Sequence, residues 1–237
     1  MLKITNFTKK YGDTVAVDNL SLEINAGEIY GFIGHNGAGK TTTLKAVVGI
    51  HGFDEGEILV NGISVKENPI EAKKQLAYIP DNPDLYDYMT GIQYLEFISN
   101  IFNVTTEDRK TKIEKFAETL EIKDSLNQDI ASYSHGMKQK LAIIGALVHD
   151  PKLIIMDEPF VGLDPKASFQ LKQVMKEMCS QGSAIFFSTH VLDTAEKLCD
   201  KVAIIKNGKL IKCGTMEEVK GDESLEEAFL ELEKDNA

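Results

Sequence analysis

One segment near the N-terminus constrains the fold more than any other part of the chain. Residues 34–41 read Gly-His-Asn-Gly-Ala-Gly-Lys-Thr and match the phosphate-binding pattern G-x-x-x-x-G-K-[ST], called the P-loop below. A strand-like run, 28–33, precedes the P-loop, and a helix-like run, 42–48, follows it, which is the context that the pattern requires. Its glycines allow backbone N–H groups to surround phosphates, and the helix N-terminus adds positive potential. The sequence therefore predicts a phosphate site between a strand and a helix.

Individual P-loop residues have separate predicted roles. Lys40 adds a positive point charge beside the phosphates and is a candidate catalytic residue, while the Thr41 hydroxyl is the expected Mg²⁺ ligand. His35 occupies a free position of the pattern, so we interpret it as a backbone donor rather than a catalyst. The other predicted nucleotide contacts are Asn36, Gly37, Ala38, Gly39 and Thr42.

A second acidic segment ends a buried strand. Residues 152–159 read Lys-Leu-Ile-Ile-Met-Asp-Glu-Pro. Because ligands of open α/β sheets bind at the carboxyl ends of strands, Asp157 and Glu158 should face the P-loop. Asp157 is then the predicted Mg²⁺ ligand, direct or through water, and Glu158 the general base that polarises the attacking water. A solvated acid pair at a strand end is the alternative.

A histidine follows the next predicted strand, in Ser188-Thr189-His190. Its position predicts that His190 orients the γ-phosphate or the water at the same edge of the sheet. The alternative for a lone histidine is a structural role.

The order of predicted elements indicates an α/β fold. Short strands fill the N-terminal third, and apolar residues at helical spacing indicate a helical block from Ile92 to about Val148. After Pro151, buried strands alternate with helices, which is typical of a parallel sheet covered on both faces. Asn207-Gly208 predicts a tight hairpin turn, and the acidic stretch 221–237 predicts a terminal helix with a frayed end.

Charge and hydropathy exclude several classes of protein. The net charge of −11 argues against broad nucleic-acid binding, which needs a basic face. Apolar runs fall far short of the roughly 20 residues that span a bilayer, and the N-terminus has no secretion signal, so we expect a cytoplasmic protein. The three cysteines fit neither a disulfide framework nor a zinc site.

One further motif gives the sequence its family resemblance. Residues 133–140, Tyr-Ser-His-Gly-Met-Lys-Gln-Lys, resemble the L-S-G-G-Q signature of the ATP-binding subunits of ABC transporters, and the resemblance covers nearly the whole chain. It implies a P-loop NTPase (RecA-like) core with an N-terminal antiparallel β subdomain and an inserted α-helical subdomain. The implied boundaries are one ABC ATPase domain over 1–220, with the core at 1–81 and 150–220, the helical subdomain at about 82–149, and a tail at 221–237.

The resemblance also implies an activity, cofactors and partners. The chain would bind ATP and Mg²⁺, hydrolyse ATP, and drive a separate transmembrane permease from the inner face of the membrane. The signature of one subunit would complete the ATP site of a second subunit, identical or different, through Ser134, Gly136 and Met137. Tyr11 is similar to the aromatic residue that stacks on adenine, Val17 to an apolar base contact, and Asp164 to the acid of the D-loop at the subunit junction.

Two positions depart from the family pattern. Asp81 stands where the family has a glutamine, and its shorter carboxylate is predicted to reach the metal through a water. His135 replaces the first glycine of the signature. Both departures, with the run 157–165, resemble the ABC-2-type and drug or bacteriocin exporters, which implies export.

Two other functional classes compete with a transporter subunit. A soluble ABC-type ATPase acting on ribosomes or DNA would use ATP to gate binding, but such proteins carry two cassettes or a long coiled coil, and this chain has one cassette and no heptad run. A P-loop kinase would leave the signature and the D-loop unexplained.

Overall fold

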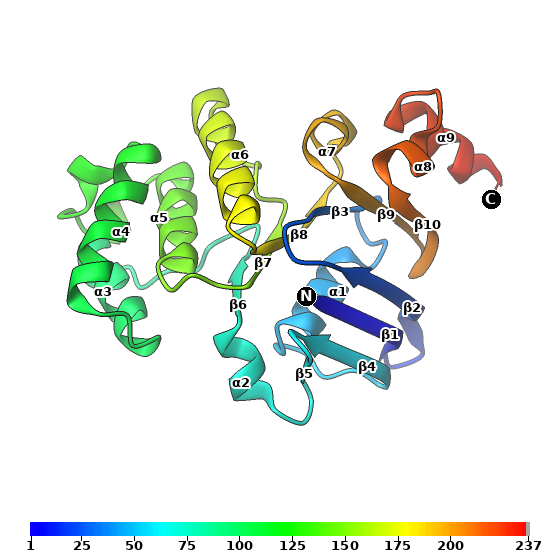
Figure 1. Ribbon diagram of the computed structural model, residues 1–237, viewed down its shortest axis with the longest axis horizontal. Helices are drawn as coiled ribbons and strands as arrows, with labels where there is room; N and C mark the ends of the chain where they lie inside the picture. The colour runs from blue at the N-terminus through cyan, green and yellow to red at the C-terminus, as the bar shows by residue number, and fades with distance from the viewer. Residues whose placement is uncertain (236–237) are drawn as a thin grey trace.

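The computed structural model describes residues 1–235, so residues 236–237 of the predicted acidic tail lie outside the described residues. Figure 1 shows two sheets, with most of the helices on one side of the larger sheet. The smaller sheet has the order β2-β1-β4-β5, and all its pairs are antiparallel. Its strands are β1 (Leu2–Tyr11), β2 (Thr14–Ile24), β4 (Glu55–Val60) and β5 (Ile63–Ser64).

The larger sheet carries the strand ends that form the site. Its order is β10-β9-β3-β8-β7-β6, and its neighbours run parallel except β10, which is antiparallel to β9. These strands are β3 (Ile29–Ile33), β6 (Leu76–Ile79), β7 (Leu153–Asp157), β8 (Ala184–Thr189), β9 (Lys201–Lys206) and β10 (Lys209–Thr215). The predicted α/β architecture is confirmed, and β6, a strand of four residues, is an addition to the predicted set.

Helices occur where the sequence predicted them, and α2 and α8 are additions to the predicted set. The helices are α1 (Lys40–Val47), α2 (Pro69–Lys74), α3 (Gly91–Ile101), α4 (Thr106–Thr119), α5 (His135–Leu147), α6 (Pro165–Ser180), α7 (Leu192–Leu198), α8 (Met216–Lys220) and α9 (Leu225–Asp235), with 3₁₀ turns at Lys123–Ser125 and Ile130–Ser132. Figure 1 places α3, α4 and α5 together at one end of the molecule, away from the smaller sheet. The boundaries of a helical subdomain near residues 82 and 149 stay predictions.

Both faces of the larger sheet are buried because its strands are apolar at successive positions. In β3, Tyr30 and Phe32 face the layer that holds α1 and the smaller sheet, whereas Ile29 and Ile33 face the opposite layer. This alternation is what strand geometry requires of a sheet covered on both sides.

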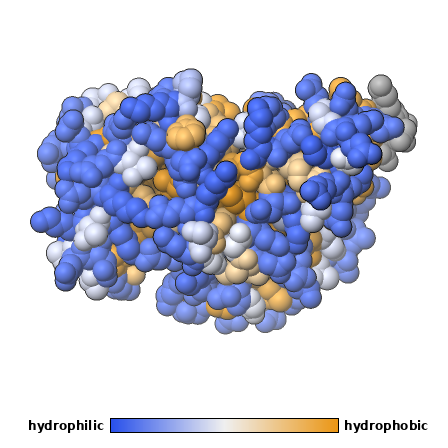
Figure 2. Space-filling view, turned by 45° about the horizontal axis from the view of Figure 1, so that its top comes forward, coloured by the Kyte–Doolittle hydropathy of each residue, from blue (hydrophilic) through white to orange (hydrophobic). Residues whose placement is uncertain are grey.

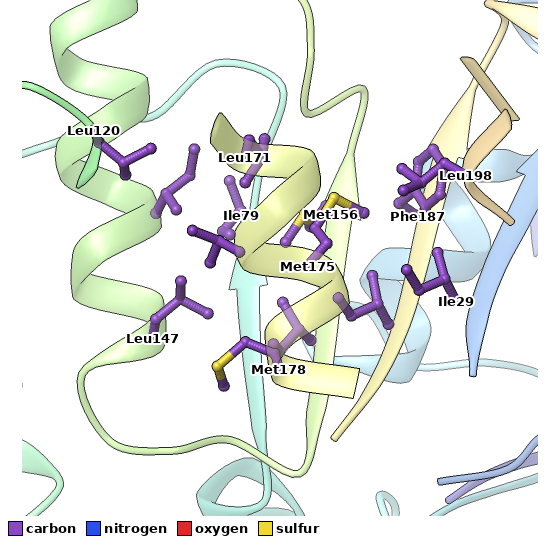
Figure 3. Packing of buried hydrophobic residues seen from close by; sticks show 14 of the residues in the cluster. Ile29, Ile79, Leu120, Leu147, Met156, Leu171, Met175, Met178, Phe187 and Leu198 are labelled. Carbon is purple, nitrogen blue, oxygen red and sulfur yellow. The ribbon is translucent and has the colours of Figure 1, made fainter. Parts of the chain in front are cut away.

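Helix α6 covers the second of these faces. Figure 3 shows Leu171, Met175 and Met178 of α6 lying over the sheet, close to Met156 of β7. The helix begins where Asp164 Oδ1 accepts a hydrogen bond from the Ala167 backbone N–H at 2.9 Å, a standard N-cap, with proline at the first helical position. This packing fixes β7 and β8, whose carboxyl ends carry acidic and hydroxyl side chains.

One face of the molecule is mainly hydrophilic (Figure 2). Figure 2 shows polar residues over most of one face, with hydrophobic residues visible toward its middle. Within residues 1–235, no helix is both long enough and apolar enough to cross a membrane.

Candidate nucleotide-binding site

Three neighbouring strands bring the site together. β3, β8 and β7 are adjacent in the larger sheet and parallel, so their carboxyl ends lie at one edge. The P-loop follows β3, Asp157 and Glu158 come at the end of β7, and His190 follows β8. The edge therefore collects the groups that the sequence predicts to act on a phosphate.

The P-loop backbone depends on two glycines. Gly37 has φ +83° and Gly39 has φ +109°, values that favour glycine. A Cβ atom on Gly39 would also lie 2.8 Å from the carbonyl oxygen of Ala16. Gly39 is the N-cap of α1 and makes no side-chain cap, so the first N–H groups of the helix remain available to a phosphate.

Lys40 lies across the P-loop. Its Nζ donates to the carbonyl oxygens of Gly34 and, at 3.2 Å, of His35. The same ammonium is 3.7 Å from Glu158 Oε1, and the residue is 6% exposed. Burial lowers the pKa of Lys40, and the nearby carboxylates of Glu158 and Asp157 partly oppose that shift.

The turn between β9 and β10 holds the P-loop from outside. The Gly208 N–H donates to the Ala38 carbonyl at 3.0 Å, and the Gly208 carbonyl accepts from the Asp18 N–H at 2.8 Å. A Cβ atom on Gly208 would lie 2.8 Å from Ala16 O, so only glycine fits this approach. The sequence predicted the turn but not its contact with the P-loop.

Asp157 faces Thr41, as predicted for a shared Mg²⁺ site. The Thr41 hydroxyl donates to Asp157 Oδ2 at 2.7 Å, and the Ser188 hydroxyl donates to the other carboxylate oxygen. Within residues 1–235, no three His, Cys, Asp or Glu side chains group as a metal site. Mg²⁺ commonly takes one or two protein oxygens and fills its other positions with water and phosphate, so the Thr41–Asp157 pair fits this ion.

Glu158 connects the two sides of the site. Its Oε1 lies 2.9 Å from His190 Nδ1 and 3.7 Å from Lys40 Nζ, and its backbone N–H donates to Ser188 Oγ at 3.1 Å. Its φ is +47°, a conformation uncommon for a residue with a side chain. The surrounding contacts hold Glu158 in this backbone conformation with its carboxylate toward the P-loop.

Lys40, Thr41, Asp157 and Glu158 line a cavity of about 380 Å³, whereas the predicted site residues Ala38 and His190 are not among its lining residues. Asp81, which follows β6, also lines the cavity, and its Oδ1 accepts from the Asn82 N–H at 2.9 Å. The lining residues are Ala16, His35, Asn36, Gly37, Gly39, Lys40, Thr41, Thr42, Asp81, Asp157 and Glu158. The cavity is thus formed largely by residues that the sequence analysis selected.

Other predicted nucleotide contacts lie outside this lining. Tyr11 is 47% exposed and has its ring beside His51, while Val17 is fully buried and its neighbour Ala16 reaches the cavity instead. Their roles toward a base stay predictions.

The signature residues form a separate feature at the start of α5. Ser134 caps the helix by accepting from the Met137 N–H at 3.3 Å, and Gly136 lies in the first turn. None of Ser134, Gly136 and Met137 lines the P-loop cavity. The described chain therefore presents two helix N-termini suited to phosphate, at two places.

Ser188 was missed as a site residue. Its hydroxyl bonds both Asp157 and the backbone of Glu158, and it is fully buried. Its position at the end of β8, beside β7, is the signal that could have identified it.

Comparison with known proteins shows similarity of both sequence and fold to ABC transporter subunits. A model of the ABC transporter family matches residues 17–161. The chain is 34% identical to the ABC-type transporter ATP-binding protein EcsA of Bacillus subtilis, over all of this chain and 98% of that protein. It is 32% identical to the linearmycin resistance ATP-binding protein LnrL of the same organism, over 91% of this chain and 69% of that one. A solved structure of an ATP-binding subunit of an ABC transporter superimposes with a TM-score of 0.95 at 32% identity, covering 98% of this chain and 99% of the other.

Proposed function

Because this chain belongs to the ABC transporter family as an ATP-binding subunit and an ATPase, we propose that it dimerises around Mg-ATP and drives a separate transmembrane permease. The observation that carries the proposal is the position of Glu158. Its carboxylate contacts both Lys40 and His190 at the edge of the P-loop cavity. A carboxylate placed beside the phosphate-binding lysine can accept the proton of a water that attacks a terminal phosphate.

Each side chain has a defined task in this proposal. Backbone N–H groups of the P-loop and Lys40 hold the β- and γ-phosphates of ATP. Glu158 accepts a proton as water attacks the γ-phosphorus and the bond to the β–γ bridging oxygen breaks, giving ADP and phosphate. His190, 2.9 Å from Glu158, orients that carboxylate and the water. Mg²⁺ held by Thr41 and Asp157, with Asp81 through a water, would neutralise charge on the phosphate oxygens.

A second copy of the chain, or a similar cassette, supplies the other side of the nucleotide. Ser134, Gly136 and Met137 lie outside the P-loop cavity, so they are available to the ATP of a partner. Closure is then a population shift, because ATP contacts both subunits only in the closed pair.

The test of the catalytic assignment is Glu158→Gln. The amide keeps the shape of the side chain but cannot accept a proton, so kcat should fall by about 10² or more while ATP still binds. Phosphate release and the Kd for ATP are the two measurements. Hydrolysis at the parent rate would overturn the assignment of Glu158.

A groove between the larger sheet and the helical block supports the proposed permease contact. This cavity of about 360 Å³ is lined mainly by apolar and aromatic side chains, among them Tyr78 of β6 and Tyr94, Ile98 and Phe102 at α3. Ile50, which is 54% exposed, lies at the groove. Exposed apolar surface of this kind marks interaction sites, and a helix of the permease is the proposed occupant.

Co-purification from detergent-solubilised membranes of the native host tests this contact. Wild type should retain a polytopic membrane protein, and Ile50→Asp should lose most of it because a charge would be buried at the contact. Ile70→Asp is the matched control, since Ile70 is 70% exposed on α2 and does not line the groove. Equal retention by both variants, or a soluble partner in place of the membrane protein, would contradict the proposal.

Export is the proposed direction of transport, with the chain at the inner face of the membrane. The support is the resemblance of Asp81, His135 and the run 157–165 to exporter subunits, together with similarity to a relative named for linearmycin resistance. The substrate is expected to be chosen by the permease.

A further inference from the structure

The C-terminal helix α9 touches the P-loop through one pair of rings. The centroids of His35 and Phe229 are 5.3 Å apart, with planes at 70°, an edge-to-face arrangement. Phe229 is 6% exposed and belongs to the main hydrophobic cluster, whereas His35 is exposed and lines the nucleotide cavity. His35 therefore stands between the helix and the cavity.

His35 also sets part of the P-loop backbone. Its carbonyl accepts from the Ala38 N–H at 3.1 Å and from Lys40 Nζ at 3.2 Å. A shift of the His35 residue would move this carbonyl, and with it a hydrogen bond of the phosphate-binding lysine. The ring contact with Phe229 is thus connected to the position of Lys40 by a short chain of contacts.

Helix α9 is firmly placed against the helix that follows His190. Leu225 is fully buried, and its backbone N–H donates to Glu196 Oε2 of α7 at 3.0 Å. Lys220, at the end of α8, donates to the other oxygen of Glu196 at 2.8 Å. Phe229 is therefore presented to His35 by a helix that is anchored independently of the P-loop.

We propose that Phe229 is a positioning residue for ATP binding, which holds the P-loop in its phosphate-binding conformation through His35. The inference rests on the proposed ATP site at the P-loop. An energetic link of this kind is reciprocal, so bound ATP should in turn stabilise the packing of α9.

A double-mutant cycle on the full chain tests the proposal. Phe229→Leu keeps apolar volume but removes the ring, so the Kd for ATP should weaken by about threefold to tenfold, the range of one aromatic pair. KM should rise by a similar factor while kcat changes little, because Glu158 and His190 are untouched. In the background of His35→Ala, Phe229→Leu should have no further effect on the Kd.

Leu230→Ala is the matched control, because Leu230 is 49% exposed on the same helix, and it should bind ATP as wild type does. A wild-type Kd for Phe229→Leu, or effects of His35→Ala and Phe229→Leu that multiply in the double variant, would overturn the proposal. If Phe229→Leu does not fold, hydrogen exchange of the wild type decides: ATP should increase the protection of amides 225–232, and unchanged protection would refute the link. Lys40→Ala tests the proposed ATP site separately from the proposed role of Phe229. Normal ATP binding by that variant would contradict the ATP site at the P-loop.

Discussion

At the scale of single residues, the loop after Glu158 is shaped by the contact between Gly162 and His135. Gly162 has φ +80°, and a Cβ atom there would lie 2.3 Å from His135 Cδ2. His135 is the first residue of α5, at the position where the family signature has a glycine. The histidine fills the space above Gly162, so the signature helix and the loop that follows the proposed base are in direct contact within one chain.

Replacement of Gly162 by alanine should therefore destabilise the protein for two reasons. The positive φ costs about 1 kcal/mol or more for a residue with a side chain, and the exposed His135 ring must leave its rotamer to admit the methyl group, which adds about 0.5–1.5 kcal/mol. Urea unfolding measures the sum. Gly182→Ala is the matched control, because Gly182 has φ +94° and nothing within 4 Å of an added Cβ. Equal losses in the two variants would show that His135 does not restrict the loop.

At the scale of elements, Glu196 joins three helices. Its carboxylate lies on α7 and accepts from Lys220 of α8 and from the first backbone N–H of α9. The hydrogen bond from Lys220, followed by that from the Leu225 backbone, holds the pKa of Glu196 below its ordinary value of 4.5. The ionised carboxylate is thus favoured by the folded state.

This shift predicts a pH dependence of stability. Because the pKa of Glu196 is lower in the folded than in the unfolded protein, its contribution is complete above about pH 4.5 and is lost as pH falls through the folded value. Glu196→Gln should be less stable than wild type at pH 7, and the difference should shrink below pH 4.5. Thermal unfolding of both proteins between pH 7 and pH 3.5 measures this. A constant difference over that range would refute the role of the charge.

The elements that the sequence predicted best are those whose residues are apolar at successive positions. β7 and β8 are continuous apolar runs bounded by polar residues, and the structure places them close to their predicted positions. β6 has only four residues and a proline directly after it, too little sequence for a period to appear. Its place in the sheet depends on pairing with β7, which is a tertiary contact.

The same distinction applies to the site. The rule that ligands bind at the carboxyl ends of strands placed Asp157, Glu158 and His190 beside the P-loop from sequence alone. Ser188 lies at the end of β8 and could have been identified by the same rule, whereas the contacts of Gly208 and Phe229 join segments far apart in the chain through backbone groups or packing. No local pattern encodes such contacts, so the structure was needed to find them.

At the scale of the whole molecule, the chain has two predicted phosphate-binding positions, and the residues of one do not line the cavity of the other. One is the P-loop, and the other is the N-terminus of α5 with Ser134 as its cap. A nucleotide held by the first of these would reach the second only on another copy of the chain, in the proposed dimer.

The proposed dimer predicts that two copies of the chain associate only when ATP is bound. With Mg-ATP, Glu158→Gln should have twice the mass of one chain by light scattering, since nucleotide is bound but not hydrolysed. Addition of Ser134→Arg should return the mass to that of one chain, because a large side chain would block the capping position. Ser180→Arg, at the exposed end of α6, should leave the dimer intact. A single-chain mass for Glu158→Gln at saturating ATP would contradict pairing of identical chains.

Two Asn-Gly turns that join antiparallel strands differ in how well they would tolerate an insertion. Asn61-Gly62 and Asn207-Gly208 both close hairpins and look equally suitable for inserting an affinity tag or a fluorescent reporter. Gly62 has nothing within 4 Å of an added Cβ, whereas Gly208 exchanges backbone hydrogen bonds with Asp18 and Ala38. A label at 61–62 would leave the nucleotide loop alone. The same label at 207–208 would break the hydrogen bonds that Gly208 makes with Asp18 and Ala38, and would disturb the P-loop.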